Sequence, residues 1–201
     1  MSLESSIFKR QTSNLNSLEL TGALFGIIGV YLTVKENIWC FPVGIINVVI
    51  TAFLVIELKL YADFLQQVVY FILLILGWYK WTHKEKITSV SKHISRLTLN
   101  ESVSNLIVWI AGSIVMYYIL ENYTDAQFPF WDSAGTVLCF IAQWFVANKK
   151  IENWILWMIA NVIYVVIYYL KGMPFYSVLT AVYFVLAING FINWKRKLAQ
   201  K

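Results

Sequence analysis

The chain contains Gly77-Trp78-Tyr79-Lys80-Trp81, and 113 positions later it contains Gly190-Phe191-Ile192-Asn193-Trp194. Each motif closes a longer segment, Leu20 to Trp81 in the first half and Ser133 to Trp194 in the second. Repeats in a strongly apolar chain are typical of transporters built from two equivalent bundles, with the substrate site between them. The repeat therefore predicts two helical units of one kind.

Two residue pairs indicate how the copies align. Gly22 and Gly135 keep the separation of 113, whereas Asn47 and Asn161 lie 114 positions apart. We therefore expect Asn47 and Asn161 to occupy equivalent positions, with a single-residue insertion in the second copy.

The composition places these segments in a membrane. The hydrophobic fraction is 59%, the charged fraction is 13% and the mean hydropathy is +0.64, whereas soluble domains average roughly 45–50% apolar and about 25% charged residues. A bilayer-spanning helix needs about 20 predominantly apolar residues. Seven windows are long and apolar enough: Leu18–Val34, Trp39–Ile56, Tyr61–Trp78, Ser102–Leu120, Ser133–Ala147, Trp154–Leu170 and Phe175–Ile192.

The fourth window has no partner in the other copy, so we interpret it as a crossover helix. Equivalent helices are then separated by an even number of spans, which makes the repeats parallel and relates them by an axis along the membrane normal. The predicted fold is an all-α membrane protein with seven transmembrane helices, two parallel three-helix repeats joined by one crossover helix (3+1+3). The predicted divisions are an exposed N-terminal arm (1–17), a first repeat (18–81), a charged connector with the linking helix (82–127), a second repeat (128–194) and a basic tail (195–201).

Lysine and arginine predict the orientation, because their excess marks the cytoplasmic side of a membrane protein. With seven spans, 12 of the 16 Lys and Arg residues lie on the side of the C-terminus and 4 on the side of the N-terminus. We therefore expect a multi-pass protein of the bacterial cytoplasmic (inner) membrane with its N-terminus outside and its C-terminus in the cytoplasm. This asymmetry explains the basic pI of about 9.1 without nucleic-acid binding.

Polar side chains at membrane depth point to function, because they are costly there without partners. The sixth window is the richest, since steps of 3, 4, 3 and 4 place five residues on one helical face: Trp154, Trp157, Asn161, Tyr164 and Tyr168. A mid-span amide one turn after an indole offers hydrogen bonds and a stacking surface to a ring-containing solute. The alternative is an aromatic belt with a packed seam, which suits Trp154 and Tyr168 near the helix ends.

Other spans supply further candidate binding residues. Gln67 and Tyr70 share one face of the third window, and Asn47 lies in the second. Gln143 and Asn189 are candidates of the same kind. For each amide the alternative role is an interhelical hydrogen bond, worth about 0.6 kcal/mol on average.

At these positions the chain resembles the PnuC family of vitamin transporters. The first half carries Gly44-Ile45-Ile46-Asn47-Val48, Leu60-Tyr61-Ala62 with Gln67, and Gly77-Trp78-Tyr79 with Trp81. The second half carries Phe128-Pro129-Phe130-Trp131-Asp132-Ser133 and Glu152-Asn153-Trp154-Ile155-Leu156-Trp157 followed by Asn161. The likeness spans most of residues 20 to 194, and its WxxWxxxN run is the most specific part.

The resemblance implies a three-plus-one-plus-three fold related to the SWEET sugar transporters. It also implies facilitated uptake of nicotinamide riboside, which a cytoplasmic kinase then traps by phosphorylation. Two positions depart from the family pattern, because Leu74 stands where an amide is usual and Tyr164 replaces a smaller residue. Thiamine, which also carries a cationic aromatic ring, is therefore an alternative substrate.

Other classes of function fit the sequence less well. An intramembrane enzyme needs a nucleophile with a base or paired carboxylates in its spans, and no His lies in a span while Glu57, Asp63 and Asp132 lie near span ends. No Cys and His spacing predicts a metal site, and no cofactor is implied. Without a mid-span carboxylate we expect no coupling ion. A structural membrane scaffold and a homo-oligomer both remain open.

Overall fold

The computed structural model describes residues 3–57, 61–88 and 93–200, and this part of the chain folds into seven helices. Each helix is long and apolar enough to cross a bilayer. Two of them, α5 and α7, begin at a proline, which has no N–H to leave unsatisfied in a first turn. The helices are α1 (Leu3–Val34), α2 (Cys40–Glu57), α3 (Tyr61–Thr88), α4 (Leu99–Tyr123), α5 (Pro129–Ala147), α6 (Asn153–Leu170) and α7 (Pro174–Ala199).

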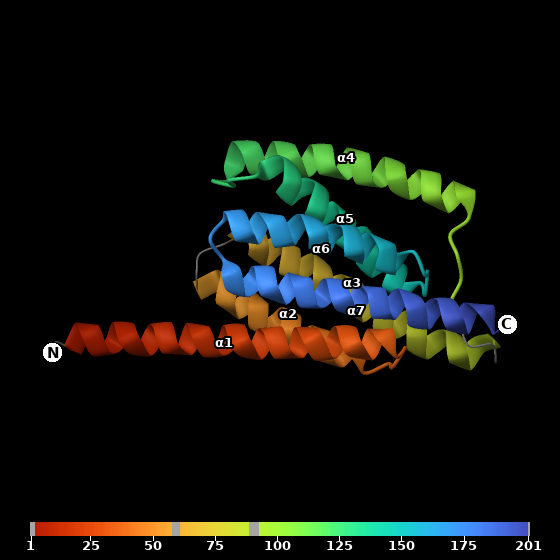
Figure 1. The fold of residues 1–201 in the computed structure, drawn as a ribbon, viewed down its shortest axis with the longest axis horizontal. Helices are drawn as coiled ribbons and strands as arrows, with labels where there is room; N and C mark the ends of the chain where they lie inside the picture. Colours follow the sequence, from red (N-terminus) through yellow and green to blue (C-terminus); the bar gives the residue numbers. More distant parts are fainter. Residues whose placement is uncertain (1–2, 58–60, 89–92, 201) are drawn as a thin grey trace.

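Six of the helices form a closed ring. Each of α1, α2, α3, α5, α6 and α7 packs against the next in that order, and α7 returns to α1. Helix α4 lies outside the ring against α5, along the upper edge of Figure 1, and has no buried residue. The ring encloses the space in which polar side chains from both halves can meet.

The helix boundaries recur at one constant separation. Helix α2 (Cys40–Glu57) and helix α6 (Asn153–Leu170) begin and end 113 positions apart, and the starts of α3 and α7 are also 113 apart. The predicted single-residue insertion is therefore wrong. Asn47 corresponds to Ala160 and not to Asn161, so the two asparagines differ by one helical position, or about 100° around the helix axis.

One end of the ring is closed by two matching aromatic pairs. The rings of Phe41 and Trp81 meet edge to face at 4.9 Å, and those of Trp154 and Trp194 do the same at 5.4 Å. All four side chains are buried. We call this end, defined by these four residues, the tryptophan end.

Two glycines make room for these pairs. A Cβ atom on Gly190 would lie 2.5 Å from the indole of Trp154, and one on Gly77 would overlap the ring of Phe41. The glycines of the two opening sequence motifs are thus explained by close approach of an aromatic ring to the helix backbone.

Charged residues link the two halves at the tryptophan end. The carboxylate of Glu36 lies 3.7 Å from Lys149 Nζ and 2.6 Å from Lys197 Nζ. Glu36 and Lys149 stand 113 positions apart in the turns after α1 and α5, and both have positive φ, 57° and 53°. The two turns therefore have the same uncommon backbone conformation and contact one another.

The connector before α4 docks on the second half. Ser95 exchanges backbone hydrogen bonds with Lys149 and Ile151, each at 3.0 Å, and Thr98 and Glu101 cap α4 reciprocally. The N-terminal segment predicted to be an arm is helical from Leu3, and α3 continues to Thr88. Lys59, Lys92 and Lys201, three of the residues used to predict the orientation, lie outside the described residues.

Candidate functional site

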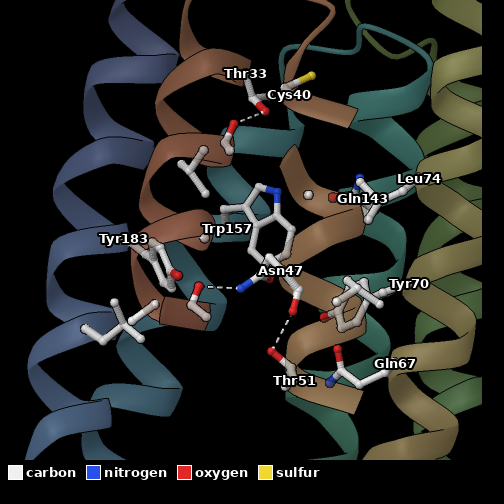
Figure 2. Close-up of a pocket in the computed structure, with 18 of the residues that line it drawn as sticks. Thr33, Cys40, Asn47, Thr51, Gln67, Tyr70, Leu74, Gln143, Trp157 and Tyr183 are labelled. Atoms are coloured by element: carbon white, nitrogen blue, oxygen red, sulfur yellow. Dashed lines mark hydrogen bonds between the residues drawn. The ribbon is translucent and has the colours of Figure 1, made fainter. Parts of the chain in front are cut away.

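A cavity of about 340 Å³ lies inside the ring, and all six ring helices contribute to its wall. The volume is within the usual range for small-molecule sites, roughly 300–1,000 Å³. Most of the wall is apolar, and amide, hydroxyl and aromatic groups project from several helices into one space (Figure 2). A mainly apolar pocket with a few convergent polar groups is the usual form of a small-molecule site.

Seven of the nine predicted site residues line this cavity: Asn47, Gln67, Tyr70, Gln143, Trp154, Trp157 and Asn161. They come from α2, α3, α5 and α6, so the site combines residues from both halves. A tertiary structure was needed to bring them together, because their sequence positions span more than half of the chain.

The other two predicted residues lie elsewhere. Tyr164 packs over Gly135, its hydroxyl lies 3.1 Å from the Thr136 hydroxyl, and its ring stacks on Tyr168 at 5.7 Å. Asn189 is exposed on α7 and does not line the cavity. One helical face of α6 thus divides between the cavity and the contact with α5.

A row of glycines on α1 lets polar groups approach its backbone. Asn47 Nδ2 donates a 2.6 Å hydrogen bond to the Gly22 carbonyl, as Figure 2 shows. A Cβ atom on Gly26 would overlap the hydroxyl of Tyr183. Asn47 therefore has the interhelical role that the sequence left open for it, at the wall of the cavity.

Three other amides are free to bind a solute. Within the described part of the chain, Gln67, Gln143 and Asn161 make no side-chain hydrogen bond, although all three line the cavity. An amide left without partners in an apolar environment carries a cost that a bound polar ligand can relieve. These side chains are the most suitable hydrogen-bonding groups of the site.

The two tryptophans of α6 differ in their positions. Trp157 is partly buried and its indole stands near the centre of the cavity in Figure 2. Trp154 is only 1% exposed and is packed against Trp194 and Gly190. Trp157 can stack on a solute, whereas Trp154 forms the floor of the cavity.

The structure adds residues that the sequence reasoning missed, namely Glu19, Thr33, Cys40, Thr51, Tyr176 and Tyr183. A signal for the first of them was available, because residues 19, 22, 26, 29 and 33 repeat in steps of 3 and 4 and all line the cavity. Cys40 and Cys139 are free and buried. Among the described residues there is no group of three His, Cys, Asp or Glu side chains suited to a metal ion.

The sequence matches a known transporter family over residues 16–196, and that family is described as nicotinamide mononucleotide transporter. The chain belongs to this family. It is 28% identical to the nicotinamide riboside transporter PnuC of Escherichia coli (strain K12), over 90% of this chain and 86% of the relative. It is 20% identical to the riboflavin/roseoflavin transporter RibM of Streptomyces davaonensis, over 88% of this chain and 83% of the relative.

The fold is also that of a solved member. A crystal structure of the vitamin B3 transporter PnuC superposes with a TM-score of 0.73 at 21% identity, covering 98% of this chain and 88% of that one. The predicted membership of the PnuC family and the predicted all-α membrane fold are confirmed. The protein is a multi-pass protein of the bacterial inner membrane, and its family and relatives are transporters and not enzymes.

Proposed function

We propose that the protein transports nicotinamide riboside across the membrane through the central cavity. The observation that carries this proposal is the presence, in one cavity, of the Trp157 indole and three amides without internal partners in the described chain. Nicotinamide riboside has a flat cationic ring, a carboxamide and ribose hydroxyls, so stacking and amide hydrogen bonds match its groups. The name of the E. coli relative supports the same substrate.

The charge of the cavity favours the riboside over the mononucleotide in the family's description. No Lys, Arg or His lines the cavity in the described residues, and Glu19 is the one charged lining residue. A phosphate group normally requires cationic side chains or helix N-termini around it. A solute without phosphate suits this wall.

The transport cycle that we propose is alternating access between two three-helix units. In this conformation the aromatic pairs and the Glu36 ion pairs close the tryptophan end, while the cavity lining extends to Leu18 and Glu19 near the opposite ends of the helices. Rocking of the units would open one end as the other closes. No ion gradient is required in this scheme, so transport is facilitated diffusion.

We propose that the tryptophan end faces the cytoplasm. Lys80, Lys149, Lys150, Arg196 and Lys197 belong to this end, and an excess of such residues marks the cytoplasmic side. A C-terminal reporter protein should then be active in the cytoplasm.

The proposed functional partner is a cytoplasmic kinase that phosphorylates the riboside and so prevents its return. A homo-oligomer remains a prediction, which light scattering of the detergent-solubilised protein would test. The structure contains the single chain.

Calorimetric binding of nicotinamide riboside, thiamine and riboflavin to the purified protein tests the proposed function. We expect saturable binding of nicotinamide riboside and much weaker binding of the other two. Asn122→Ala, an exposed amide on α4 outside the ring, serves as the matched control and should bind as the wild type does. Tight thiamine or riboflavin binding without nicotinamide riboside binding would contradict the proposal.

A further inference from the structure

Glu19 is the one charged residue among the described residues that line the cavity. It lies on α1 on the face that also carries Gly22, Gly26 and Gly29, so its position on that helix directs it toward the same space. The phenol of Tyr176 on α7 also lines the cavity and lies within hydrogen-bonding reach of the Glu19 carboxylate. The end of the cavity opposite the tryptophan end thus combines a carboxylate with an aromatic ring.

No cationic side chain neutralises Glu19 within the described residues. Other carboxylates in this part of the chain are paired, since Asp132 lies 2.9 Å from Lys171 Nζ and Glu36 contacts two lysines. Glu57 and Asp63 are exposed and do not line the cavity. Glu19 therefore gives the cavity a net negative charge that no described side chain balances.

We propose that Glu19, supported by Tyr176, is the residue that selects solutes with a cationic ring over neutral ones of the same shape. A carboxylate facing a mainly apolar cavity attracts a cation more strongly than it would in water, because the local dielectric constant is low. The face of Tyr176 adds attraction for the same charge. This inference rests on the proposed function and extends it from a substrate to the rule by which the substrate is chosen.

The matched probes are nicotinamide riboside and its 1,4-dihydro form. The dihydro form carries the same carboxamide and ribose but has gained a hydride, so its ring is neutral. Wild-type protein should bind the cationic form more tightly. Glu19→Gln, which keeps the side-chain size, should weaken binding of the cationic form by about tenfold and change binding of the neutral form by less than about twofold.

Control variants separate charge from structure. Glu57→Gln removes an exposed carboxylate on α2 that does not line the cavity and should change neither affinity. Tyr176→Phe keeps the ring and removes the hydroxyl, so it should weaken binding of the cationic form by a smaller factor than Glu19→Gln does. Thermal denaturation of each variant checks folding. A measurement on the wild type needs no variant, because only the cationic form should lose affinity as the NaCl concentration rises.

Three outcomes would overturn the inference. Equal binding of both forms by the wild type, or equal loss of both in Glu19→Gln, would show that the charge of Glu19 does not select the solute while leaving the proposed function intact. Persistence of the wild-type preference in Glu19→Gln would do the same. Absence of binding of either form to the wild type would overturn the proposed function and this inference together.

Discussion

Trp81 and Trp194 make the same hydrogen bond in opposite directions across the molecule. The indole N–H of Trp81 on α3 donates to the Val146 carbonyl on α5, and that of Trp194 on α7 donates to the Thr33 carbonyl on α1, both at 3.3 Å. The donors are 113 positions apart and so are the acceptors. These bonds join the halves at both of their shared boundaries in the ring, at the end where the aromatic pairs close the cavity.

We predict that Trp81→Phe and Trp194→Phe favour opening of the tryptophan end. Each removes one interhelical bond of about 0.6 kcal/mol, which corresponds to about a threefold shift in an opening equilibrium. Cys40 lines the cavity near this end and reports on opening, once Cys139→Ala has removed the other cysteine. Its labelling by a maleimide should accelerate in both variants and remain unchanged in Trp39→Phe, whose indole is 63% exposed. Unchanged labelling would contradict the proposed role.

A second prediction concerns Gly26 and Tyr183. Gly26→Ala places a methyl group against the Tyr183 hydroxyl, so the phenol must move and the cavity must change shape. We expect reduced affinity for nicotinamide riboside, with a cost of about 1–3 kcal/mol for the overlap. Adding Tyr183→Phe removes the atom that overlaps and leaves Cζ 3.3 Å from the new methyl, so the double variant should recover part of the loss. Equal loss in the single and double variants would show that the packing is not the cause.

The third prediction tests the two groups proposed to hold the solute. Trp157→Ala removes the stacking surface, and Asn161→Ala removes an amide worth about 0.5–1.5 kcal/mol if it binds the substrate. Both should reduce uptake severely while expression and thermal stability stay near normal. Asn189→Ala, an exposed amide on α7 away from the cavity, should transport as the wild type does. Wild-type uptake by both cavity variants would also favour the scaffold hypothesis.

Leu74 distinguishes the two vitamins. Its side chain is buried against Gly44 and lines the cavity. Leu74→Asn should preserve or strengthen nicotinamide riboside binding through a new bond to a ribose hydroxyl, and it should weaken thiamine binding by about 1–3 kcal/mol through an unpaired amide. The control is Leu73→Asn, whose side chain does not line the cavity. Tight thiamine binding by the wild type that Leu74→Asn weakens, without nicotinamide riboside binding, would reverse the substrate assignment.

The fifth prediction concerns energy coupling. Proteoliposomes should take up nicotinamide riboside without Na⁺ or a proton gradient, and uptake should stop when the inner and outer concentrations are equal. The physical reason is that Glu19, the carboxylate of the cavity, is proposed to bind the solute's own charge. Accumulation driven by an imposed ion gradient would show that a carboxylate binds the coupling ion instead.

The sequence determined the membrane location, the seven helices and most of the cavity residues. Apolar length decides whether a segment spans a bilayer, and a polar group inside such a segment is costly enough to be informative alone. Both signals are local in the chain. For this reason Gln67, Trp157 and Asn161 could be identified without coordinates, and their lining of one cavity agrees with that reading.

The tertiary structure decided what local patterns leave open, because the faces of a helix are assigned by its neighbours. Periodicity placed Trp154, Trp157 and Tyr164 on one face of α6, but contact with α5 takes Tyr164 away from the cavity and contact with α7 buries Trp154 in its floor. Sequence matching aligned Asn47 with Asn161, whereas the helix boundaries separate them by one position. Glu19 gained significance only when packing placed it on a cavity wall without a cationic neighbour in the described chain.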